Sequence, residues 1–144
     1  MNHNNSKPTY LTMSNTLEQE QEFTSQKWTD ISGDPDCIYF IENHLYNTPD
    51  HLQKIDWTAL SANFEAVHIL ENNMHKIDWV QFSTNCGAIH ILSQNIEKIH
   101  WPSLCKNSAA KQLLKANPTK WNSLECDIDS DFYDDAEIYS YLLK

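Results

Sequence analysis

The chain has 144 residues, a length typical of one domain, and carries ten lysines, no arginine and 20 acidic residues, for a formal charge of −10. Arginine binds phosphate through paired hydrogen bonds. Its absence and the excess of acidic residues therefore argue against nucleic acid and anionic membrane surfaces as partners. Two glycines leave no glycine-rich phosphate loop, and no apolar run is long enough to span a bilayer.

Residues 1–24 are polar and rich in Asn, Ser, Thr, Gln and Glu. Such a composition buries too little apolar surface to order the chain, so we predict a flexible arm followed by a folded domain at residues 25–144. The arm lacks the apolar stretch of a secretory signal. The four cysteines have no CxxC spacing and are expected to be free thiols in a reducing compartment, so we expect a protein that is not secreted.

The rest of the chain is dominated by a 22-residue pattern that occurs three times without a gap, starting at Lys54, Lys76 and Lys98. Its consensus is Lys-Ile-Asp-Trp-x-x-Leu-Ser-x-Asn-x-x-Ala-Ile-His-Ile-Leu. A first copy, followed by about seven extra residues, and a last, interrupted copy flank these three. Repetition at a fixed period predicts units that stack and share one core. We expect about five units, starting near Trp28, Trp57, Trp79, Trp101 and Trp121.

Each unit is expected to fold as two short helices, the first beginning after Asp56 or its equivalent and the second after an asparagine. Apolar residues three and four positions apart mark one side of the second helix. Helices this short are marginal alone, so these residues must pack between units. The predicted caps of the second helix are Asp34, Asn63, Asn85 and Asn107. The predicted core comprises Trp28, Trp57, Leu60, Ile69, Leu70, Trp79, Phe82, Ile91, Leu92, Trp101, Leu104, Leu113, Leu114 and Trp121.

Two positions of the repeat, the tryptophan and the asparagine at the end of the second helix, lead to further predictions. We assign the tryptophans to packing, and expect Trp79, with a unit on each side, to contribute more stability than Trp28 near the N-terminal end. The second helix ends at Asn73, Asn95 or Asn117. Asparagine tolerates the left-handed conformation that ends many helices, so we expect that conformation at these three positions.

The alternative fold is a leucine-rich-repeat-like α/β solenoid, because residues 64–74 fit that template and its units have about 20 to 29 residues. A strand, however, would turn Leu70 and its equivalents, which are all apolar, away from the core. Residues 108–116 are also helix-forming throughout. The favoured prediction is an all-α fold, a short α-solenoid of about five helix-turn-helix units.

The last unit begins at Trp121 and is interrupted by an acidic stretch, which we interpret as a terminal cap of the stack. Asp127, Asp129 and Asp131 resemble the opening of a calcium-binding loop. The glycine and glutamate that an EF-hand needs later in the loop are absent, so an acidic loop without a bound ion is favoured over a calcium site.

His68 and His90 occupy the same position in adjacent units, and two histidines can begin a zinc site. No third ligand has matching spacing, so we assign both to solvent-facing helix positions and predict no metal or cofactor. Scattered Ser, Cys and His residues form no argued set of nucleophile and base. An enzyme is therefore not expected.

The consensus resembles the short tryptophan-containing repeats found in many proteins of giant DNA viruses of amoebae, the mimivirus-like group. The resemblance spans about residues 27–124, although the Asn-Pro pair frequent in that family survives only as Asp34-Pro35. It implies a viral protein made in the host cytoplasm and located there or in the virion. The family contributes no catalytic motif.

Two functional classes follow from these patterns. The favoured one is a non-enzymatic scaffold or protein–protein interaction module that binds a protein partner through one face of the stack, as a monomer rather than an oligomer. The alternative is an acidic binder of calcium or of a basic host or viral partner. Binding of the second kind is expected to weaken steeply with salt.

Overall fold

The computed structural model describes residues 25–47 and 53–121, and every regular element in these ranges is an α-helix or a 3-10 helix. The all-α prediction is therefore confirmed, and the α/β alternative is wrong for this part of the chain. The neighbours Ile69 and Leu70 are both buried, which one side of a helix allows and the alternating faces of a strand do not. The predicted arm at 1–24, the acidic last unit after Trp121 and the calcium candidates Asp127, Asp129 and Asp131 lie outside the described residues.

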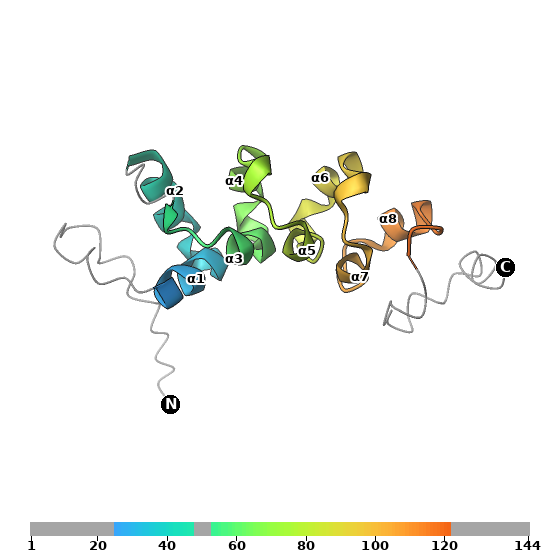
Figure 1. Cartoon of the computed structure of the whole chain (residues 1–144), viewed down its shortest axis with the longest axis horizontal. Helices are drawn as coiled ribbons and strands as arrows, with labels where there is room; N and C mark the ends of the chain where they lie inside the picture. The colour runs from blue at the N-terminus through green and yellow to red at the C-terminus, as the bar shows by residue number, and fades with distance from the viewer. Residues whose placement is uncertain (1–24, 48–52, 122–144) are drawn as a thin grey trace, which may run out of the picture.

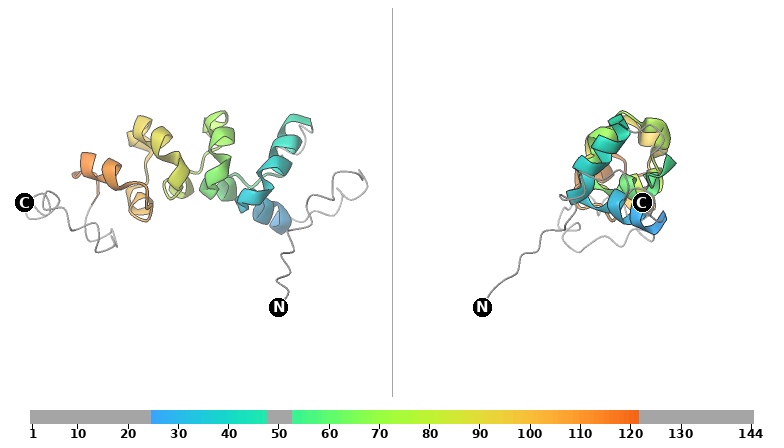
Figure 2. Two further views of the ribbon diagram at one scale, coloured as in Figure 1. Left: turned by 180° about the vertical axis from the view of Figure 1, so that it is seen from behind. Right: turned by 90° about the vertical axis from the view of Figure 1, so that its left-hand side faces the viewer.

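The helices form an elongated row in which successive pairs follow one another along one axis (Figures 1 and 2). The first helices of the pairs pack in sequence, α1 on α3 and α3 on α5. They lie along one side of the row: α1 (Ser25–Gly33), α3 (Trp57–Ala62), α5 (Trp79–Phe82) and α7 (Trp101–Leu104). The second helices lie along the other side: α2 (Ile38–Asn47), α4 (Val67–Glu71), α6 (Ile89–Gln94) and α8 (Lys111–Ala116).

Single turns of 3-10 helix complete the units. Asp56 begins α3, because its carboxylate accepts hydrogen bonds from the N–H groups of Thr58 and Ala59, both at 3.0 Å. Asp78 caps α5 in the same way, whereas His100 caps α7. The turns that lead into second helices are η3 (Pro35–Cys37), η5 (Phe64–Ala66) and η7 (Cys86–Ala88). The turns that lead to the next unit are η6 (Met74–Lys76) and η8 (Ile96–Lys98).

The asparagines that end the second helices are not left-handed, so that expectation is wrong. Asn73, Asn95 and Asn117 all have φ of −131°. Each side chain instead donates from Nδ2 to the carbonyl four residues earlier, for example to Ile69 O at 2.8 Å. This bond satisfies a carbonyl that the end of the helix leaves open, without any change of backbone handedness.

The core runs along the row between the two sets of helices. Leu60, Phe82 and Leu104 are completely buried, one from each of three successive first helices. Leu70, Leu92 and their equivalents contribute the same side of the second helices. Because each unit supplies only a few such side chains, the core exists only where units meet.

The tryptophans differ in burial more than the repeat suggests. Trp28 is 4% exposed, whereas Trp57, Trp79, Trp101 and Trp121 are only partly buried. The ten-residue α2 accounts for part of this difference, since Phe40 and His44 place their rings 6.0 and 5.9 Å from that of Trp28. Trp28 is therefore more buried than Trp79, although Trp79 was expected to contribute more to stability.

Cys37 and Cys86 are free thiols, but Cys105 is disulfide-bonded, so the expectation of four free thiols is wrong. Among the described helices, none is both long and apolar enough to cross a membrane.

Candidate protein-binding face

A buried ladder of asparagine side chains sets the orientation of each unit on the one before it. Asn85 is 2% exposed; its Oδ1 accepts from Gly87 N–H at 3.0 Å, and its Nδ2 donates to Ser61 O at 3.0 Å and Asn63 O at 2.9 Å. Asn107 repeats this arrangement one unit later. Asn63 and Asn107, like Asp34, also cap the turn that follows them. A residue predicted as a local cap therefore also binds the preceding unit.

A column of serines completes the ladder, and the sequence reasoning missed it. Ser61 is completely buried; its Oγ donates to Trp57 O at 2.7 Å and accepts from Asp78 N–H at 3.0 Å. Ser83 makes the equivalent pair of bonds, and Ser32 accepts from Asp56 N–H. The signal was visible in the sequence, because a serine follows the buried apolar residue of the first helix in three consecutive units.

Because the ladder gives successive units the same orientation, equivalent residues of the second helices form rows on the outer surface. Tyr39, His68, His90 and Gln112 form one such row, and all four are exposed. The assignment of His68 and His90 to exposed helix positions agrees with this placement. No group of three His, Cys, Asp or Glu residues in the described ranges is arranged to hold a metal ion.

The first two units carry the largest exposed aromatic side chains of the described residues. Tyr39 is 78% exposed and Phe64 is 48% exposed. The two second helices are joined by a direct contact, since His68 Nε2 lies 2.7 Å from Glu42 Oε1. Tyr39 is one turn from Glu42 on α2, and Phe64 lies in η5, the turn that leads directly into α4 and His68, so we group the two aromatics with this pair. We name this group the acidic-aromatic face: Asp36, Tyr39, Glu42, Phe64, Glu65, His68 and Glu71.

The charge of the row changes sign from one end to the other. Residues 25–47 contain four acidic residues and one lysine, a formal charge of −3, and residues 53–75 have a charge of −2. Residues 98–121 contain five lysines and no acidic residue, a charge of +5. The second helices of the first two units contain no lysine. Of the side chains that define the acidic-aromatic face, four are carboxylates and none is a lysine.

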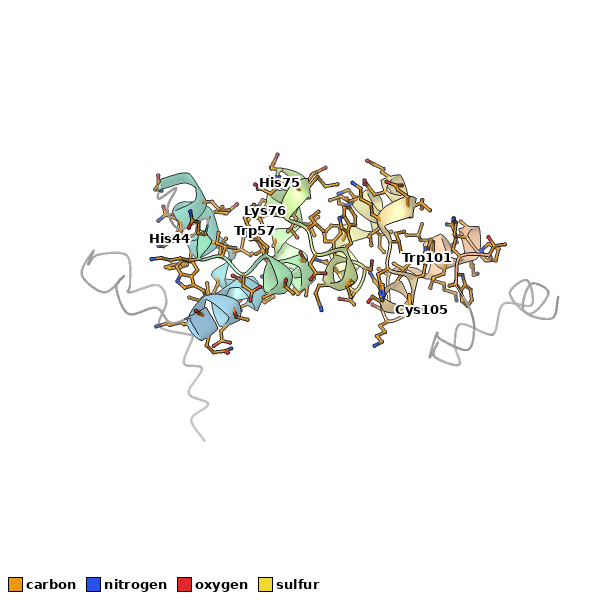
Figure 3. All side chains as sticks on the ribbon, in the orientation of Figure 1. His44, Trp57, His75, Lys76, Trp101 and Cys105 are labelled. Carbon is orange, nitrogen blue, oxygen red and sulfur yellow. The ribbon has the colours of Figure 1, made fainter. Side chains whose placement is uncertain are left out.

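The tryptophans do not form an open groove for a ligand. Lys98 Nζ lies 4.9 Å from the centre of the Trp79 ring, which also packs edge-on against Phe82. Trp57 and Trp101 lie within the row between neighbouring helix pairs (Figure 3). Trp57, Trp79 and Trp101 are each partly buried in the row.

The thiol of Cys37 is not a nucleophile at neutral pH. Burial, followed by the charge and hydrogen bond of Asp34 and the charge of Asp36, raises the pKa of Cys37 to about 11. The thiol is 3.5 Å from Asp34 Oδ2, to which it donates. Since the thiolate is the reactive form of cysteine, this group is structural.

No family model, curated protein or solved structure matches this chain.

Proposed function

We propose that this protein is a non-enzymatic helical-repeat module, a short α-solenoid that binds another protein through the acidic-aromatic face. The observation that carries the proposal is the exposure of Tyr39 and Phe64 within an anionic surface. Large apolar side chains exposed beside charged ones are typical of protein-interaction sites, where aromatic residues supply most of the contact energy.

The chemistry of the face suits one kind of partner, a peptide segment that carries lysine or arginine together with an apolar side chain. The apolar group would pack on Tyr39 or Phe64, and the cations would pair with Glu65, Glu71 and the carboxylates beside them. This form of the proposal combines the scaffold class with the basic-partner alternative. A calcium site has no comparable support, because its candidates Asp127, Asp129 and Asp131 lie outside the described residues.

The resemblance to repeats of giant-virus proteins leads us to propose further that the protein is viral and acts in the host cytoplasm or in the virion. A protein partner would then be either a host protein or another viral protein. Neither catalysis nor a cofactor is part of the proposal.

The experiment that tests the proposed function is selection from a displayed library of random peptides, using the full chain as bait and a Tyr39→Ser/Phe64→Ser variant for counter-selection. We expect enrichment of basic peptides that carry an apolar residue. Synthetic copies should lose at least about tenfold in affinity on the double variant, a typical cost for truncating interface anchors. Binding should also weaken steeply between about 0.05 and 1 M NaCl.

Val80 provides the matched control, because it is 45% exposed on α5, on the opposite side of the row. Val80→Ser should leave peptide binding unchanged. Enrichment of acidic peptides, or binding that the Tyr39→Ser/Phe64→Ser variant retains, would show that another surface is used and would overturn the proposal.

A further inference from the structure

Glu42 and His68 join the first two units within the acidic-aromatic face. Glu42 belongs to α2 and His68 to α4, and Nε2 of the imidazole lies 2.7 Å from Oε1 of the carboxylate. The side chains of His68 and Glu42 are 53% and 34% exposed, so a partner on this face can reach both. The carboxylate of Glu42 is therefore shared between a neighbour in the same chain and any cation that a bound partner carries.

The protonation state of His68 decides how much of the charge of Glu42 a partner meets. A neutral imidazole can donate one hydrogen bond from Nε2, and the carboxylate then keeps its full negative charge. An imidazolium in the same place forms an ion pair with a net charge of zero. Histidine changes between these two states across the physiological pH range, whereas ordinary carboxylates and lysines stay charged there.

The surroundings of His68 supply no second carboxylate at ion-pair distance. Helix α4 packs on α3, η5 and η6, and it lies between α2 and α6 in the row (Figure 1). The groups on these elements that are not buried and that carry charge or titrate below about pH 8 are Glu42, Glu65, Glu71, His75, Lys76 and His90. Glu71 and His90 occupy the positions of Glu42 and His68 one unit later, yet within residues 25–47 and 53–121 no ion pair joins them.

We propose that His68 makes binding at the acidic-aromatic face depend on pH, because its protonation neutralises Glu42 and weakens the hold on a basic partner. This inference rests on the proposed function, since it concerns the affinity of that same face. Acidification from about pH 7.5 to about pH 5.5 removes the charge of one of the four carboxylates that define the face. The affinity for a basic peptide should fall by roughly 1.5- to 5-fold, the range for one exposed charge interaction.

The test is the affinity of a histidine-free basic peptide from the selection for the full chain, measured by calorimetry at about pH 7.5 and about pH 5.5 and at constant ionic strength. We expect weaker binding at the lower pH for the unchanged protein. His68→Gln should remove the difference, and glutamine suits this position because Gln112 occupies its equivalent in α8. The matched control is His75→Gln/His90→Gln, which removes the two other exposed histidines nearby and should retain the difference.

Glu42→Gln tests whether the carboxylate carries the effect. This variant should bind the peptide more weakly than the unchanged protein at neutral pH and should change less on acidification, because no carboxylate remains for His68 to neutralise. A pH effect that persists in His68→Gln, that stays undiminished in Glu42→Gln, or that disappears in His75→Gln/His90→Gln would overturn the proposal.

The same measurements separate this inference from the proposed function. Equal affinities at the two pH values, together with binding that the Tyr39→Ser/Phe64→Ser variant loses, would overturn the role of His68 alone. Absence of peptide binding at about pH 7.5 would overturn the proposed function and this inference with it.

Discussion

The first and last units of the described row share one backbone plan and carry opposite charges. In both, an Asp or Asn side chain caps the turn before the second helix, and a buried isoleucine or leucine lies in the last turn of the first helix. Yet residues 25–47 have a charge of −3 and residues 98–121 a charge of +5. The difference teaches that a few buried positions fix the fold, and that outward positions are free to acquire separate roles.

Few buried positions are needed, because one buried side chain forms hydrogen bonds with several backbone groups at once. Asn85 alone accepts one hydrogen bond and donates two, to the carbonyl groups of Ser61 and Asn63 in the preceding unit. Outward-facing positions are not needed for this backbone hydrogen bonding, so their residue types can differ between units. The position of Tyr39 and His68 is Gln112 in the last described unit, and the position of Glu42 is Lys115. Glu42 and Glu71 of the acidic-aromatic face and Lys115 near the basic end therefore show one position of the second helix carrying opposite charges.

The largest expected loss of stability follows from the difference in tryptophan burial between the two ends of the row. Trp28→Ala should lower the free energy of unfolding by about 3–5 kcal/mol, because the ring is buried and a cavity would remain. Trp101→Ala should cost clearly less, since that ring is only partly buried. Urea unfolding followed by circular dichroism measures both values. Equal costs would show that position in the row, rather than burial, sets the contribution of each tryptophan.

The second-largest expected loss of stability tests the asparagine ladder, which the two ends of the row share. Asn85→Ala and Asn107→Ala should each cost roughly 2–4 kcal/mol, because each leaves buried carbonyl groups without a donor. Asn95→Ala is the matched control; its half-buried side chain donates a hydrogen bond to Ile91 O, and its loss should cost about 1 kcal/mol. If Asn107→Ala were as mild as Asn95→Ala, the ladder would not extend into the basic end.

The sequence predicted the parts of this fold that depend on local spacing. The caps at Asp56 and Asn63 could be foreseen because an N-cap is recognised within three or four residues. The bonds from Asn85 to residues 22 and 24 positions earlier could not, since they depend on how units stack. The burial of Trp28 was predicted, but its greater burial than that of the other tryptophans was not, because it depends on the length of α2 and on its neighbours.

The smallest expected effect is a pH-dependent loss of stability at the junction between α1 and α3, where Thr29 donates a hydrogen bond to Asp56. The hydrogen bond from Thr29, at 2.7 Å, is the main cause that lowers the pKa of Asp56 below its ordinary value of 3.8; burial opposes it, and the N–H groups of Ala59 and Thr58 add to it. A carboxylate whose pKa is lowered by folding stabilises the fold above its unfolded pKa, and this contribution is lost as pH falls through the folded value. Stability at this junction should therefore decrease only below about pH 4.

Asp56→Asn should accordingly lower the melting temperature at neutral pH, and the difference from the unchanged protein should shrink as pH falls below about 4. Thr29→Val should show a weaker version of the same behaviour, because it removes one of the three hydrogen bonds to the carboxylate. His100 occupies the equivalent position at the basic end, so His100→Asn should not reproduce this convergence in the acid range. A constant difference between Asp56→Asn and the unchanged protein from neutral pH down to about pH 3 would mean that the side chain acts by packing and not through its charge.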